Sequence, residues 1–251
     1  MRIAPGTALV SLVHLVANAL LLLLGYYWLG LSESNAFHLA WSFLVIAVFV
    51  ATAIWLHGAT FVYFDGHEDR LQNAAKLALR HLPPLSVLTL ISVVIYVLLW
   101  RWTRSFAHAG FLISSYVTMT LRIPATPASV IRTLNGIFWF VRWIVLPVCL
   151  IPVFANVAKR GWPGFYPKLL RAGKKWVYRI EVAILILCAI WLPFRLFAWR
   201  PEFKAFALQM ASFLLRAGLA YLLFVAGLLA IERLTSAGRP DFSQPSRAPS
   251  P

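Results

Sequence analysis

Six long apolar stretches dominate the sequence. They cover residues 7–29, 36–57, 84–102, 133–158, 176–199 and 204–231. A helix of about 20 apolar residues is long enough to cross the hydrocarbon core of a bilayer. Strands in lipid would instead need short segments of alternating polarity closed into a barrel. The sequence therefore predicts an all-α integral membrane protein, a bundle of six transmembrane helices.

Composition agrees with lipid as the surrounding solvent. Charged residues make up 12% of the chain, against about 25% in soluble domains. The net charge is +15, but the basic residues are spread between the apolar stretches. We therefore expect membrane lipids with anionic headgroups as partners, and no nucleic acid. Cys149 and Cys188 both fall inside predicted spans, and nothing in their spacing calls for a metal or another cofactor.

The distribution of Lys and Arg predicts the orientation. With the N-terminus in the cytoplasm, the inner segments hold fourteen Lys and Arg and the outer ones seven. Cytoplasmic loops carry the excess of basic residues, so we expect both termini on the cytoplasmic side of a bacterial inner membrane. We divide the chain into a polytopic membrane domain, residues 1–233, and a tail, residues 234–251. The tail is rich in Pro and Ser, which predicts disorder.

Two connections are more than simple loops. Residues 65–82 contain an apolar stripe at helical spacing, which includes Leu71, Ala74 and Ala78. This pattern predicts an amphipathic helix at the inner interface. Residues 103–132 form the longest outer connection and include an uncharged apolar segment, 111–121. An interfacial helix, a re-entrant segment and a lid over the bundle all fit that segment.

An acidic cluster stands before the amphipathic helix, at Asp65, His67, Glu68 and Asp69. Carboxylates and an imidazole in this order are candidate metal ligands. The alternative interpretation is structural: Asp65 caps the helix and Glu68 completes a capping box. We favour the cap.

Two arginines lie deep in predicted spans, Arg142 in the fourth and Arg216 in the sixth. A cation at that depth costs at least roughly 3 kcal/mol on insertion scales. One hypothesis is a cavity that binds an anionic substrate or lipid headgroup, with Lys159, Arg160, Lys174 and Lys175 as further lipid contacts. The other is that backbone carbonyls satisfy both guanidinium groups, including carbonyls released by Pro147 and Pro152. Gln209 and Asn135 are further possible partners, and we count Asn135 among the intramembrane polar residues.

Histidines also occur inside the spans. His14 and Asn18 lie one turn apart on the first span, and we expect them to form structural hydrogen bonds, with a proton path as the alternative. His38 and His57 lie near opposite ends of the second span. They cannot share a metal ion without ligands from elsewhere.

The order of the segments suggests a family. Two uncharged spans precede the helix 70–81 and the sequence Leu82-Pro83-Pro84, and a basic segment, 158–163, follows the fourth span. This layout resembles the six-span membrane domain of bacterial glycerophosphodiester phosphodiesterases and its stand-alone relatives. In that family catalysis belongs to a separate soluble domain, so the resemblance transfers no catalytic residue.

No sequence motif commits the chain to a reaction. It has no Gly-rich phosphate loop, no nucleophile elbow and no His-Glu-x-x-His. The leading prediction is a non-enzymatic membrane scaffold or accessory subunit that contacts anionic lipid, with a membrane-protein partner or a second copy. A transporter or lipid-handling protein with an anion site at Arg142 and Arg216 is the alternative. An intramembrane enzyme comes third.

Overall fold

The computed structural model describes residues 5–32, 34–66, 70–165 and 176–237. Within these ranges the chain is helical and contains no strand. The helices are α1 (Pro5–Leu29), α2 (Ala36–Phe64), α3 (Leu71–Arg80), α4 (Leu82–Thr103), α5 (Phe106–Thr120), α6 (Pro127–Phe140), a π-helical turn η1 (Val141–Val145), α7 (Leu146–Arg160), a short 3-10 turn η2 (Trp162–Phe165), α8 (Trp176–Ala198) and α9 (Phe206–Ala237).

Six helical segments are long and apolar enough to cross a membrane, which confirms the predicted all-α membrane fold. Five of them are α1, α2, α4, α8 and α9, and the sixth is the continuous rod of α6, η1 and α7. The predicted boundaries differ from the observed ones at two functionally relevant ends. Helix α2 runs seven residues past the predicted end at 57, and α9 runs six residues past the predicted end at 231, through the first four residues of the predicted tail. The remainder of the predicted tail, 238–251, lies outside the described residues.

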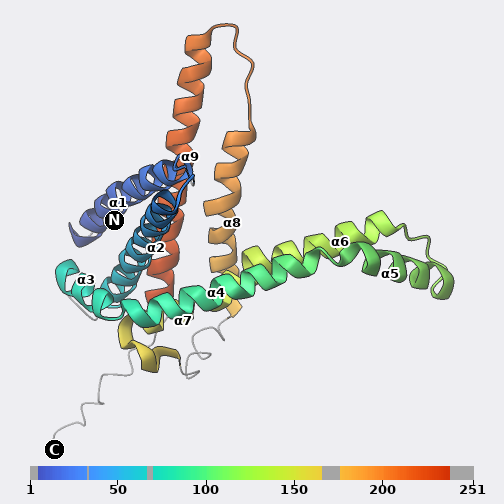
Figure 1. The fold of residues 1–251 in the computed structure, drawn as a ribbon, viewed down its shortest axis with the longest axis horizontal. Helices are drawn as coiled ribbons and strands as arrows, with labels where there is room; N and C mark the ends of the chain where they lie inside the picture. The colour runs from blue at the N-terminus through green and yellow to red at the C-terminus, as the bar shows by residue number, and fades with distance from the viewer. Residues whose placement is uncertain (1–4, 33, 67–69, 166–175, 238–251) are drawn as a thin grey trace, which may run out of the picture.

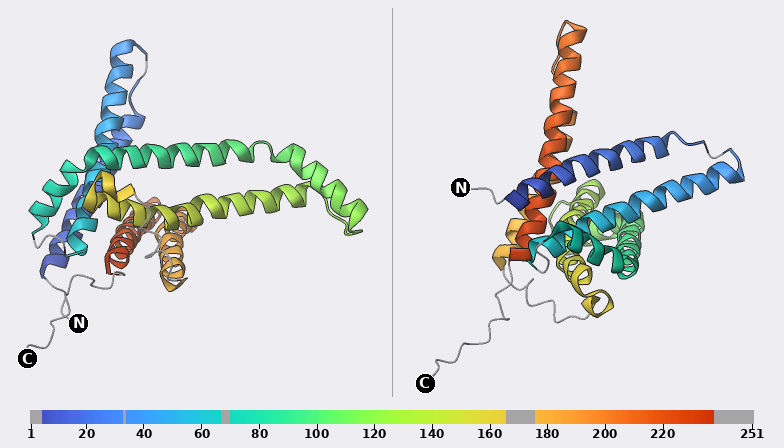
Figure 2. Two further views of the ribbon diagram at one scale, coloured as in Figure 1. Left: turned by 90° about the horizontal axis from the view of Figure 1, so that it is seen from below. Right: turned by 90° about the vertical axis from the view of Figure 1, so that its left-hand side faces the viewer.

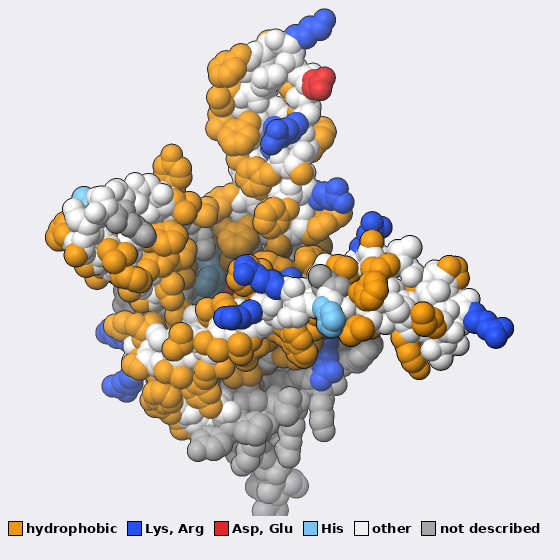
Figure 3. Space-filling model, turned by 45° about the vertical axis from the view of Figure 1, so that its right-hand side comes forward, with side chains coloured by type: hydrophobic (Ala, Val, Ile, Leu, Met, Phe, Trp, Pro, Cys, Tyr) orange, Lys and Arg blue, Asp and Glu red, His pale blue; other side chains and the backbone are white. Residues whose placement is uncertain are grey.

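The spans form three hairpins that diverge from a common base, as Figures 1 and 2 show. The first hairpin pairs α1 with α2, the second pairs α4 and α5 with the rod α6–η1–α7, and the third pairs α8 with α9. We call the base, where the α2, α4, α7 and α9 ends gather with α3, the hub. Away from the hub, apolar side chains cover much of the hairpins on the face drawn in Figure 3, with separate Lys and Arg side chains among them.

Two apolar clusters hold the hub together. One joins α2, α3, α4 and α7 through Phe61, Val62, Ala74, Leu85, Leu88, Ala155, Val157 and Ala158. The other joins the rod to the third hairpin through Ile144, Val148, Val182, Ile186 and Ile231. Gly58 allows the first cluster to close, because a Cβ atom there would lie 3.1 Å from the Leu85 side chain. The buried Ala74 and Ala78 confirm the predicted amphipathic stripe of α3.

The connection 103–132 forms α5, which packs antiparallel against α6. Their approach is close at Gly110, where a Cβ atom would lie 2.4 Å from Ile131. The rod Pro127–Arg160 has 34 residues, or roughly 50 Å of helix, against about 30 Å of hydrocarbon. The α5–α6 end therefore extends beyond one bilayer thickness, and it points away from the other hairpins in Figure 1. It does not form a lid over them.

The π-helical turn η1 has a local cause. Pro147 lies two residues after its end, and in a regular helix the proline ring would collide with the Trp143 carbonyl. The backbone widens instead, so that the Leu146 N–H donates to the Val141 carbonyl, five residues back. The predicted distortion by Pro147 therefore takes the form of a π-turn, and Arg142 lies within it.

A substitution in α9 tests the packing of the third hairpin. A Cβ atom at Gly227 would lie 2.4 Å from the Ala189 Cβ of α8, whereas one at Gly218 meets nothing within 4 Å. We expect Gly227→Ala to destabilise the protein by about 1–3 kcal/mol, because the hairpin is already fully packed. Gly218→Ala, which gains the same helix propensity, should leave the melting temperature in detergent unchanged or raise it. Equal melting temperatures for the two variants would contradict this account.

Candidate functional site

Three ionisable side chains from three spans meet next to the hub. They are His14 of α1, His57 of α2 and Glu232 of α9, and their nearest ligand-type atoms all lie within 4.8 Å of one another. The His57 Nδ1 and Glu232 Oε1 atoms are 2.5 Å apart, and His14 Nε2 lies 3.8 Å from Glu232 Oε2. We refer to these three residues as the His–Glu cluster. It joins the first hairpin to the third.

Helical spacing places the polar neighbours of the cluster. Thr60 follows His57 by three residues and Asn18 follows His14 by four, so each pair shares one face of its helix. The Thr60 hydroxyl donates to the Leu56 carbonyl (2.9 Å), so its oxygen accepts from His14 Nε2 at 2.6 Å. This assigns the proton of His14 to Nε2. The Asn18 amide lies 3.4 Å from His14 Nδ1 and also donates to the His14 carbonyl.

Burial makes the carboxylate of Glu232 unusual. The side chain is 4% exposed, and Oε2 has no hydrogen-bond partner. Its ion-pair partners among the described residues are His14 and His57, with no Lys or Arg beside them. Leaving a buried acceptor unsatisfied costs about 1–3 kcal/mol, and more for a charged group. His57 is less enclosed, with 27% of its side chain exposed, and this leaves the cluster accessible from one side.

Sequence reasoning found part of this site and missed its central residue. His14 and Asn18 do form the structural hydrogen bonds that were expected. His57 was left without partners, and Glu232 was placed one residue outside the sixth span. The sequence does contain a signal for Glu232, because this residue directly follows the apolar run 228–231. A Glu that continues an apolar helix is a candidate intramembrane group.

Asp65, the first residue of the predicted acidic cluster, has a different structural role from the one predicted. Asp65 does not cap α3; it is the C-cap of α2 and pairs with Lys159 of α7. The N-cap of α3 is Arg70, whose side chain forms no capping hydrogen bond. The physical reason is that the Lys159 ammonium is buried and requires a counter-charge. His67, Glu68 and Asp69 lie outside the described residues, so their metal role stays a prediction.

Both deep arginines donate hydrogen bonds to backbone carbonyls. Arg216 donates to the carbonyls of Ser212, of Leu196 near the end of α8, and of Trp199 just beyond it. Arg142 donates to the Phe138 carbonyl at 3.4 Å, and its guanidinium lies 5.8 Å from the centroid of the Tyr96 ring. These contacts match the structural alternative. An anion site at Arg142 and Arg216 stays a prediction.

The remaining predicted residues are scattered. Asn135 and Arg160 are exposed on α6 and α7, whereas Lys159 turns its charge toward Asp65 inside the fold. Lys174 and Lys175 lie in a part of the chain that the structure does not describe. Contact with lipid headgroups by these lysines and by Arg160 stays a prediction.

No family model, curated protein or solved structure matches this chain. The resemblance to the membrane domain of glycerophosphodiester phosphodiesterases therefore stays a prediction. The same holds for the inner membrane and the cytoplasmic termini. The chain is a multi-spanning membrane protein.

The pair of Asp65 and Lys159 can be tested directly. We expect Asp65→Asn to destabilise the protein by about 2–4 kcal/mol, because the substitution leaves the buried Lys159 charge without its carboxylate. Arg160→Gln, which removes the neighbouring exposed cation, is the matched control and should be close to neutral. Thermal unfolding in detergent measures both. A wild-type melting temperature for Asp65→Asn would show that the pair contributes nothing.

Proposed function

We propose that this membrane protein binds a divalent transition-metal ion at the His–Glu cluster, and that the ion is its physiological ligand. The buried carboxylate oxygen of Glu232 without a hydrogen-bond partner, facing two imidazoles, carries the proposal. Native proteins leave few buried polar atoms unpaired, and each one calls for an explanation. A metal ion between the three side chains would satisfy this oxygen and neutralise the carboxylate.

The distances fit such an ion after small movements. Zinc bonds of about 2.0–2.1 Å in a tetrahedral site place the ligand atoms roughly 3.3 Å apart. The contact between His14 Nε2 and Glu232 Oε2, now 3.8 Å, would shorten, and the 2.5 Å contact of His57 with Oε1 would lengthen. These two changes are below about 1 Å, and the third separation between ligand atoms, at most 4.8 Å, would close by up to about 1.5 Å on this bond geometry. The partly exposed His57 has room to make the larger movements.

The ligand set selects the class of ion. Two imidazoles and one carboxylate suit zinc and its neighbours in the first transition row, whereas magnesium and calcium require mostly oxygen ligands. Three protein ligands leave a fourth position for a water molecule or a substrate atom. A metal ion at His14 Nε2 would replace the hydrogen bond to Thr60 and leave the ring proton on Nδ1, where the Asn18 amide, turned to present its oxygen, would accept it as the outer partner of the histidine.

Metal titration of the purified full-length chain tests the proposal. After treatment with a chelator, we expect stoichiometric binding of Zn²⁺ and a visible spectrum of tetrahedral Co²⁺. His14→Gln and Glu232→Gln should abolish both signals. Asn18→Leu, which removes only the outer partner, should weaken binding roughly 10–100-fold.

His38→Gln is the matched control, because His38 lies at the opposite end of α2 and bonds to Ser34. It should bind like the wild type. Binding that survives both Glu232→Gln and His14→Gln would place the metal elsewhere. A wild-type chain that melts normally and retains neither Zn²⁺ nor Co²⁺ would overturn the proposal.

A scaffold or accessory subunit is the second candidate, and the divergence of the hairpins favours it (Figure 1). Large apolar side chains such as Leu215 of α9 and Leu98 of α4 are exposed on hairpins that separate beyond the hub. A membrane-protein partner or a second copy would cover such flanks. We expect the protein to copurify in mild detergent as an assembly larger than the 28.2 kDa chain. A lone monomer by light scattering would count against this role.

A further inference from the structure

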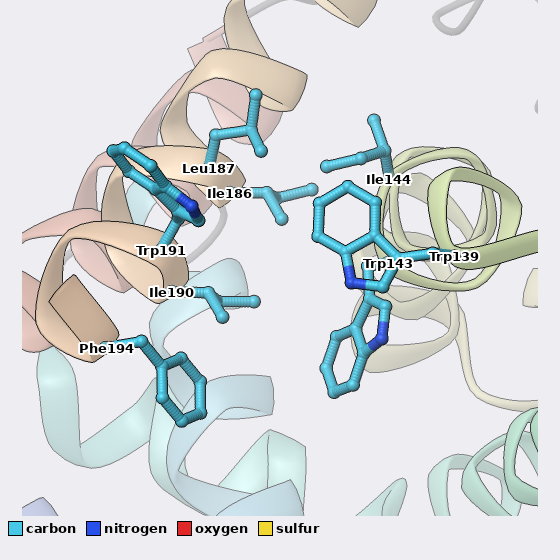
Figure 4. Close-up of a pocket in the computed structure, with 8 residues that line it drawn as sticks. All are labelled: Trp139, Trp143, Ile144, Ile186, Leu187, Ile190, Trp191 and Phe194. Carbon is cyan, nitrogen blue, oxygen red and sulfur yellow. The ribbon is translucent and has the colours of Figure 1, made fainter. Parts of the chain in front are cut away.

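An apolar cavity lies between the second and third hairpins, apart from the His–Glu cluster. Its volume is about 310 Å³, which is within the range of small-ligand pockets. Trp139 and Trp143 face it from α6 and η1, and Ile190, Trp191 and Phe194 face it from α8, as Figure 4 shows. The side chains that line it are all aliphatic or aromatic. Its occupant must therefore be apolar where the cavity encloses it.

The cavity opens onto the sides of two spans. Trp139, Trp191 and Phe194 are 43%, 47% and 69% exposed, although they lie within spans that are apolar enough to cross a bilayer. The exposed apolar surface of a spanning helix faces lipid. A lipid tail can reach this cavity sideways, whereas a soluble ligand would have to cross that apolar surface.

A positive charge stands beside the cavity. The Arg195 guanidinium lies 4.7 Å from the centroid of the Trp191 ring, three residues before the end of α8. A charged residue near a helix end is placed at the headgroup level. In the described part of the chain, no carboxylate pairs with Arg195. Its charge is therefore available to a group outside the protein.

We infer that this cavity binds one acyl chain of an anionic phospholipid, whose phosphate contacts Arg195. The aromatic side chains that line the cavity would contact the acyl chain, and the positive charge of Arg195 would favour lipids with an anionic headgroup. The inference concerns a site that the sequence did not suggest, because neither Arg195 nor Trp191 was a candidate there. It does not depend on metal binding by the His–Glu cluster.

Native mass spectrometry of the full-length chain tests the headgroup. The probes are phosphatidylglycerol and phosphatidylcholine with identical acyl chains. We expect Arg195→Gln to reduce the preference for phosphatidylglycerol roughly fivefold, the effect of one cation near a membrane surface. The matched control is Arg104→Gln, because Arg104 is also exposed and stacks on a tryptophan, Trp100, but does not adjoin the cavity. Equal effects of the two substitutions would overturn the inference.

A photoreactive phosphatidylglycerol, with a diazirine on its acyl chain, tests the cavity without any substitution. Crosslinks should fall on residues 139–144 and 186–194, the segments that line it. Ile190→Trp, which fills the cavity, should remove them while the melting temperature in detergent stays at the wild-type value. Crosslinks that avoid both segments, or that persist in the Ile190→Trp variant, would show that the acyl chain of the lipid binds elsewhere.

Discussion

The contact between Glu232 and His57 joins two hairpins that otherwise diverge. In lipid, apolar side chains gain little from touching one another rather than the acyl chains, so polar contacts and close packing determine which helices meet. The His–Glu cluster is such a contact between α9 and the first hairpin. The Tyr221 hydroxyl, which donates to the Leu15 carbonyl, and the Ser236 hydroxyl, which donates to the Phe61 carbonyl, reinforce it. Together these contacts fix the position of the third hairpin against the first.

Small residues let the helices approach closely enough for those contacts to form. Gly58 follows His57 directly and packs against Leu85, Ala78 and Ala158 of three other helices. Gly227 lies five residues before Glu232 and brings α9 against Ala189 of α8. His57 and Glu232 therefore belong to helices whose positions are fixed nearby by close packing at a glycine. This packing holds the two side chains in place relative to the hub.

The sequence predicted the elements well and the site poorly, for different physical reasons. An apolar run of about 20 residues forms a spanning helix in lipid, so the hydropathy pattern alone was enough to predict the six spans. The spacing of apolar residues was likewise enough to predict the amphipathic helix α3. Contacts between spans do not follow from pattern, because lipid-facing and helix-facing positions are equally apolar. Glu232 escaped notice because helix ends cannot be located within a few residues from hydropathy. Asp65 was read as a local cap, although its partner, Lys159, lies 94 positions away and was itself read as a lipid contact.

The two proposed sites share one structural support. Ile144 and Ile186 line the apolar cavity and also belong to the cluster that joins the rod to the third hairpin. Ile231, which precedes Glu232, packs in that same cluster. The position of the Glu232 carboxylate thus depends on side chains that form a wall of the cavity. Substitutions meant to test the cavity should therefore fill it from Ile190, which packs against the edge of this cluster without being one of its buried residues, and leave Ile144 and Ile186 intact.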